Sequence, residues 1–137
     1  MSERSKLNQP IIAEFRANAG KVGGQFADTP LLLLNTTGAT SGQSRTNPLA
    51  YITDGDRTIV FAANGGRDRH PAWYYNVLAN PLVTVELGGE QFQAHAFVAE
   101  EPERTRLYAQ MVESNPGFAN FEQKTSRRIP AVILERT

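Results

Sequence analysis

The stretch LLLLNTTGATSGQSRTNPLAYITDGDRTIVFAANGG, residues 31–66, decides the fold. Apolar residues dominate 31–35, 45–53 and 57–63, and turn-forming residues separate these runs, so each run predicts a strand. The Asp54-Gly55-Asp56 turn predicts a hairpin between the second and third strands. Strands joined by such short turns pair antiparallel.

The flanking sequence adds helices and a second group of strands. Residues 9–19 predict a short amphipathic helix with Pro10 in its first turn, ended by Gly20, Gly23 and Gly24. Residues 71–79 predict a helix that buries one stripe, formed by Trp73, Tyr74, Val77 and Leu78. The remaining elements are a hairpin of strands over 82–87 and 91–99, a helix from about Glu101 with Leu107, Tyr108, Met111 and Val112 on one face, a short helix over 118–125 and a last strand over 130–135.

Six short strands joined mostly by tight turns favour a closed sheet over a flat one. We therefore predict an α+β fold in which a small, mainly antiparallel β-barrel of about six strands is flanked by helices. The 137 residues suit a single domain over 1–137, with residues 1–25 as an N-terminal helical segment.

The composition excludes several classes of function. Lys plus Arg equals Asp plus Glu, at 14 each, which gives no general attraction to nucleic acid. The absence of cysteine excludes disulfides and thiolate chemistry. No apolar run is long enough for a signal peptide or a membrane span, so we expect a cytoplasmic protein. Peripheral membrane contact and the oligomeric state stay open.

Two segments carry the candidate chemistry. Residues 36–49, TTGATSGQSRTNPL, offer small residues, hydroxyls and Arg45, which suit a phosphate or carboxylate, although a plain hairpin loop has the same composition. Residues 62–81, AANGGRDRHPAWYYNVLANP, combine glycines, arginines and a helix start. His70 and His95 lack metal-ligand spacing and are interpreted as surface or capping residues, so no metal is expected.

Together the two segments and the late stretch NPGFANFEQKTSRRIPAVIL resemble the deazaflavin (F420)-dependent nitroreductase family. The resemblance covers about residues 32–134. It implies a split β-barrel of the flavin-reductase type and the cofactor F420, which passes a hydride to a small-molecule substrate, an electron-poor nitro compound, quinone or activated alkene. FMN on the same fold is the alternative cofactor, and a non-catalytic cofactor or ligand carrier is the alternative function.

The resemblance also assigns candidate residues. Residues 39–41 and 45–50 would hold the phosphate and the ring edge, 62–64 the next part of a groove, 72–76 the ring, and Phe118 the substrate side. The predicted cofactor-binding residues are Ala39, Thr40, Ser41, Arg45, Thr46, Asn47, Pro48, Leu49, Ala50, Ala62, Ala63, Asn64, Ala72, Trp73, Tyr74, Tyr75, Asn76 and Phe118.

Three expectations about roles follow. Relatives often carry basic residues at the positions of Ala39, Thr40 and Asn64, so this chain must bind anions with other residues. Arg45 is expected to anchor the cofactor. Trp73 is expected to be mainly structural, with Asn76 closer to the site. No catalytic residue is assigned, because the sequence contains no nucleophile motif.

Overall fold

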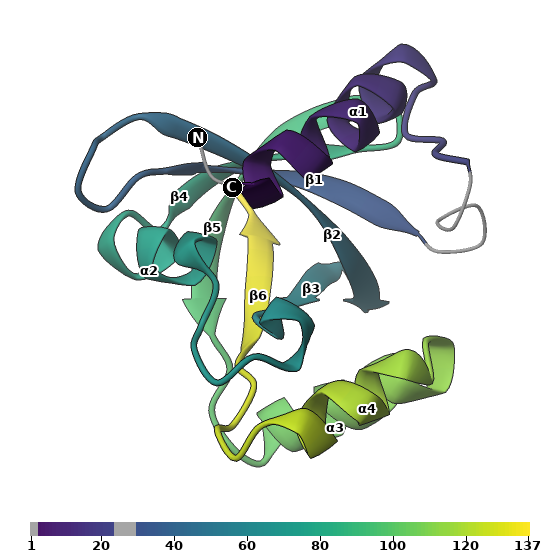
Figure 1. Cartoon of the computed structure of the whole chain (residues 1–137), viewed down its shortest axis with the longest axis vertical. Coiled ribbons are helices and arrows are strands. Elements are labelled where there is room, and N and C mark those ends of the chain that lie inside the picture. The colour runs from purple at the N-terminus through teal and green to yellow at the C-terminus, as the bar shows by residue number, and fades with distance from the viewer. Residues whose placement is uncertain (1–2, 24–29) are drawn as a thin grey trace.

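The computed structural model describes residues 3–23 and 30–137, and its centre is a closed six-stranded barrel (Figure 1). The strands close in the order β1-β2-β3-β6-β5-β4, and every neighbouring pair is antiparallel. The predicted antiparallel barrel is confirmed. The strands are β1 (Leu31–Thr37), β2 (Ser44–Asp54), β3 (Arg57–Phe61), β4 (Leu82–Leu87), β5 (Glu90–Val98) and β6 (Ala131–Arg136).

The four leucines that begin β1 are all buried, although successive strand residues point to opposite faces. Leu32 and Leu34 belong to the cluster inside the barrel, whereas Leu31 and Leu33 pack outside it against Phe15 of α1 (Glu3–Ala17). A helix therefore covers the outer face of β1, which explains why the sequence shows a continuous apolar run rather than an alternating one.

The other helices cover further parts of the barrel. Helix α2 (Ala72–Ala79) contributes Trp73 and Val77 to the inner cluster. Helices α3 (Glu103–Ser114) and α4 (Gly117–Lys124) lie together at one side of the barrel, over a second cluster on the outer faces of β2, β3 and β6 (Figure 1). No helix within the described residues is long and apolar enough to cross a membrane.

Two local predictions were wrong. Helix α1 begins at Glu3, so Pro10 lies inside it rather than in its first turn. The apolar pattern starts only at Ile11, so it did not predict the polar helical turns that precede this residue. Leu78 was placed on the buried stripe of α2 but is 54% exposed, because the short helix turns only Trp73 and Val77 into the barrel. Gly24 lies outside the described residues.

The pairing of β2 matters most for the site. All of 44–50 pairs with β1, but β3 pairs only with 51–54 of β2. After Phe61 the chain leaves β2, and the Ala62 N–H donates to the Pro130 carbonyl on the β6 side (3.0 Å). No other strand of the described chain pairs with the second edge of 44–50. We call this stretch the free edge of β2.

Candidate functional site

The β1–β2 hairpin loop, residues 38–43, is fixed at both ends. The Gly38 N–H donates to the Gln43 carbonyl (2.7 Å), and the Gly42 N–H donates to the Gly38 carbonyl (3.0 Å). Asn76 of α2 connects the middle of the loop to the barrel. Its Oδ1 accepts from the Ala39 N–H (3.0 Å), and its Nδ2 donates to Thr36 Oγ1 (3.1 Å).

The segment from Asn64 to His70 links β3 to α2. Asn64, Gly65 and Gly66 all have positive φ, a conformation that glycine adopts freely and asparagine tolerates better than most residues. A Cβ on Gly66 would lie 3.0 Å from the Lys124 Cβ. This glycine therefore allows α4 to approach, rather than the flat ligand that the sequence suggested.

Arg127, in the connection between α4 and β6, holds this segment. Its Nε donates to the Arg67 carbonyl (2.9 Å), its Nη2 donates to the Ala63 carbonyl (2.8 Å), and its Nη1 lies 3.0 Å from His70 Nδ1. The His70 ring also packs on Tyr74, with ring centroids 4.5 Å apart. Burial, and then the charge of Arg127, lower the pKa of His70 below its usual value.

The predicted cofactor-binding residues fall into three groups by exposure. Five are buried, and the other thirteen offer surface. Thr46 uses part of its polar surface, because its Oγ1 donates to Asn35 Oδ1 (2.5 Å) on the outer face. The buried residues are Ala62, Ala63, Trp73, Asn76 and Phe118; the half-buried are Thr46, Asn47, Pro48, Leu49, Ala50, Asn64 and Tyr74; the exposed are Ala39, Thr40, Ser41, Arg45, Ala72 and Tyr75.

Four of the five buried members belong to the core clusters, and two of these four are aromatic. Trp73 is 3% exposed and packs in the inner cluster, as expected of a structural residue. Phe118 is 9% exposed and contacts Phe61 and Phe121 edge to face, and its carbonyl accepts from the Tyr108 hydroxyl (2.6 Å). Burial, chiefly, raises the pKa of Tyr108 to about 12, so this phenol stays protonated.

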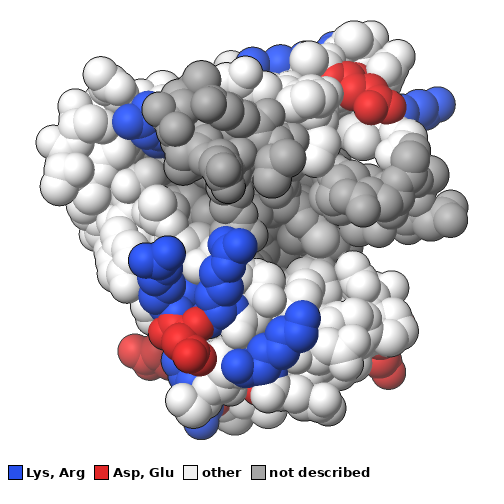
Figure 2. Space-filling view, viewed as in Figure 1, with Lys and Arg blue, Asp and Glu red and all other residues white. Residues whose placement is uncertain are grey.

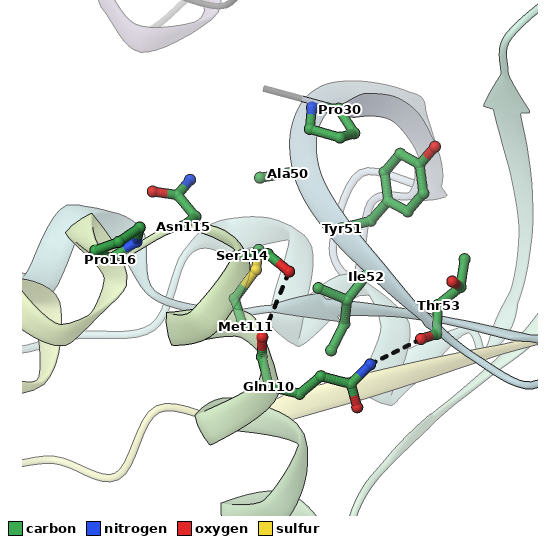
Figure 3. Close-up of a pocket in the computed structure, with 10 residues that line it drawn as sticks. All are labelled: Pro30, Ala50, Tyr51, Ile52, Thr53, Gln110, Met111, Ser114, Asn115 and Pro116. Atoms are coloured by element: carbon green, nitrogen blue, oxygen red, sulfur yellow. Dashed lines mark hydrogen bonds between the residues drawn. The ribbon is translucent and has the colours of Figure 1, made fainter. Parts of the chain in front are cut away.

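A cavity of about 440 Å³ lies beyond the free edge, between β2 and α3 (Figure 3). Ala50 is the one predicted cofactor-binding residue that lines it. The cavity wall is apolar at Ile52 and Met111, and the Asn115 side chain stands at its other side (Figure 3). Gln110 is engaged with the Thr53 carbonyl (3.0 Å). The full lining is Pro30, Ala50, Tyr51, Ile52, Thr53, Gln110, Met111, Ser114, Asn115 and Pro116.

Basic side chains are available to an anionic ligand. Arg45, Arg67 and Arg69 are exposed, and within the described chain their guanidinium groups have no hydrogen-bond or ion-pair partner. Figure 2 shows basic side chains gathered around acidic ones on the lower part of one face. Arginine pairs readily with phosphate and carboxylate groups, so these residues suit an anionic ligand.

Sequence reasoning missed Arg127 and interpreted His70 only as a surface or capping residue. Arg127 lies in the run TSRRIP, residues 125–130, where no periodicity distinguishes it from its neighbour Arg128. Its acceptors are 57 to 64 positions away in the sequence, so only the folded chain brings them together.

A family model for F420H(2)-dependent quinone reductases matches residues 9–136. This chain belongs to that family. An F420H(2)-dependent quinone reductase of Mycobacterium tuberculosis is 38% identical over 128 residues, which is 90% of this chain and 86% of that protein. A second, putative quinone reductase of the same organism is 36% identical over 105 residues, 77% of this chain and 88% of that one.

Solved structures agree with the family. A structure of an F420-H2 dependent reductase (FDR-A) superposes with a TM-score of 0.71 and 38% identity, covering 77% of this chain and 94% of the other. A domain-swapped dimer superposes with a TM-score of 0.74 and 32% identity, covering 98% and 100%. This chain is therefore an oxidoreductase of split-barrel fold whose cofactor is F420.

Proposed function

We propose that F420 binds along the free edge of β2 and that the enzyme passes a hydride from the reduced cofactor to a quinone. One observation carries this proposal: within the described chain the seven strand residues 44–50 pair only with β1, a fixed loop precedes them, and the exposed Arg45 among them has no ion-pair partner. A long, flat, anionic molecule such as F420 fits that combination of backbone donors and positive charge.

The loop end would hold the phosphate. Asn76 fixes the loop before any ligand arrives, which reduces the entropy that binding must overcome. Ser41 Oγ accepts from the Gln43 N–H (3.2 Å), so its hydroxyl hydrogen stays available to donate. Arg45 follows at the start of β2 and supplies a charge-assisted contact.

The far end would hold the ring. Ala50 lies at the point where β2 parts from β3, and Asn64, Ala72 and Tyr75 present surface in the segment that follows β3. When bound, F420H2 supplies a hydride. The chain's own residues would hold the ring and the acceptor at reacting distance, which can contribute up to about 7–11 kcal/mol of barrier lowering.

The quinone would occupy the cavity between β2 and α3. The relatives are named quinone reductases, and Ala50 belongs both to the cavity and to the predicted ring position. Ile52 and Met111 form an apolar wall suited to an aromatic ring system, and the Asn115 amide can donate to a quinone carbonyl. Water would supply the proton that follows the hydride.

The test is a titration of the purified protein with F420 and with FMN, followed by steady-state oxidation of F420H2 with a quinone such as menadione. We expect saturable F420 binding, weaker FMN binding and quinone-dependent oxidation. Binding of F420 without turnover on any quinone, nitro compound or activated alkene would indicate a carrier instead. Preference for FMN would refute the cofactor assignment at this site.

A variant of the cavity locates the quinone. Met111→Trp fills the apolar wall and should raise KM for menadione while leaving the F420 dissociation constant unchanged, because Met111 lies on α3 and is not one of the predicted cofactor-binding residues. Thermal denaturation monitors whether the larger side chain disturbs the core. An unchanged KM in a folded variant would place the quinone elsewhere.

A cytoplasmic location remains our expectation for the enzyme.

A further inference from the structure

Arg127 is a half-buried cation that forms no salt bridge with a carboxylate of the described residues. Within the described chain none of the salt bridges involves it, whereas its neighbour Arg128 pairs with Glu101. All three of its side-chain nitrogens instead face the connection between β3 and α2, at the Ala63 and Arg67 carbonyls and the His70 ring. Burial is the main cause that lowers the pKa of Arg127, yet an arginine stays charged at neutral pH.

This contact determines the protonation of His70. A guanidinium group only donates hydrogen bonds, so His70 Nδ1 must accept, and the proton of the neutral ring is then on Nε2. Burial and the adjacent positive charge both favour the neutral ring. The Tyr74 ring packs on the His70 ring with centroids 4.5 Å apart, and the Tyr75 ring meets it edge to face with centroids 5.9 Å apart. These contacts restrain the orientation of the His70 ring.

We propose that Arg127 is a positioning residue that holds His70 as an Nε2–H donor, and that His70 donates this hydrogen bond to the bound cofactor. The inference rests on the proposed function, because that function places F420 beside Asn64, Ala72 and Tyr75, and Tyr75 approaches the edge of the His70 ring. Flavin-like rings carry carbonyl oxygens and ring nitrogens that accept such a bond. No hydrogen bond within the described chain uses His70 Nε2.

A purely structural role for Arg127 predicts different results. If Arg127 only held the loop, His70 could be replaced by any residue of similar size without loss of cofactor affinity. If His70 donates to the cofactor, His70→Leu should lose affinity, whereas His70→Gln should retain most of it, because the glutamine Nε2 can donate from a similar position. Arg128 is the matched control, since it is adjacent in sequence, exposed and bonded elsewhere.

The first measurement is made on the protein without cofactor. Imidazole 15N–1H correlation spectra at pH 7 should show the neutral Nε2–H tautomer for His70 in the wild type and in Arg128→Met. Arg127→Met should give a mixture of tautomers and a raised pKa, because the neighbouring cation is gone. Within the described chain the titratable groups that face His70 are Arg127, Tyr74 and Tyr75. Burial raises the pKa of Tyr74 above its usual value. An Nδ1–H tautomer or a protonated ring in the wild type would overturn the inference.

The second measurement is the affinity for F420. His70→Leu and Arg127→Met should each bind about tenfold more weakly, the effect of one lost hydrogen bond, and His70→Gln and Arg128→Met should stay within about threefold of wild type. If Arg127→Met fails to fold, the comparison of His70→Leu with His70→Gln decides whether His70 donates to the cofactor. Failure of the wild type to bind F420 would refute the proposed function. Equal affinity of wild type and a folded His70→Leu would refute this inference alone.

Discussion

Replacing Asn76 by alanine removes two hydrogen bonds of helix α2, one from the Ala39 N–H in the loop 38–43 and one to Thr36 Oγ1 in β1. Thr36 is 3% exposed and Asn76 is 7% exposed, so water reaches neither the Thr36 hydroxyl nor the position of the lost amide easily. Each bond contributes about 0.5–1.5 kcal/mol, and a buried group left without a partner costs about 1–3 kcal/mol. We therefore expect Asn76→Ala to lower the free energy of unfolding by about 2–4 kcal/mol.

Asn80 provides the control on the same helix. Its Nδ2 also reaches β1, but at 3.5 Å from the Thr37 carbonyl and at a more exposed position. Asn80→Ala should therefore cost less than about 0.5 kcal/mol. The assay is urea denaturation of both variants, with thermal melts expected to differ by roughly 4 °C for each kcal/mol.

The same substitution should loosen the loop before it unfolds the barrel. Hydrogen exchange at the Ala39 amide should accelerate in Asn76→Ala, because that N–H loses its acceptor. F420 affinity should fall as well, by up to about tenfold, since the loop must then be ordered on binding. Equal stability of Asn76→Ala and Asn80→Ala, or unchanged exchange at Ala39, would refute this account of the loop.

Three further predictions address the core, the anion contact and the response to acid. Trp73→Ala should lose about 3–5 kcal/mol of stability in urea denaturation, because the side chain is buried in the inner cluster. If this variant melts at the wild-type temperature but no longer binds the cofactor, the main role of Trp73 is in the site. Arg45→Ala should weaken F420 binding by about 1.5–3 kcal/mol without a change in melting temperature, and unchanged affinity at moderate salt contradicts its role as an anchor. The pKa of Asp54 is lowered to about 2 by hydrogen bonds from Arg106 and Arg57. A lowered carboxyl pKa stabilises the fold above the ordinary value near 3.8 and loses that effect as pH falls toward 2, so the stability difference between wild type and Asp54→Asn should disappear over that interval in denaturation curves.

Local patterns predicted most of the elements. The strand β4 matches its predicted range, 82–87, because alternation and a following Gly-Gly turn mark both ends. The helix predicted over 71–79 forms at Ala72–Ala79, where Pro71 precedes it. The start of α1 was missed, since helix propensity without an apolar stripe gives little signal in a single sequence.

Features that depend on contacts between distant parts of the chain could not be predicted from local sequence patterns. Closure of the barrel depends on pairing β1 with β4 and β3 with β6, which no local turn specifies. The free edge of β2 likewise appears only once the ends of β3 are known, because the sequence predicted strand through Ala63 and the structure ends it at Phe61. The family motifs pointed to residues of the free edge and to residues that follow β3. The burial of Ala62 and Ala63 could not be predicted from those motifs and is seen only in the folded chain.

The free edge of β2 also bears on how the protein behaves in concentrated solution. Alternate residues of an unpaired strand direct N–H and C=O groups outward, and such a strand is a template for addition of a strand from another molecule. Two residues oppose that reaction: Pro48 has no N–H to offer, and Arg45 brings charge to the start of the strand. The stretch that we assign to cofactor binding is therefore also where self-association through intermolecular strand pairing would begin, and Pro48 and Arg45 protect the chain against it.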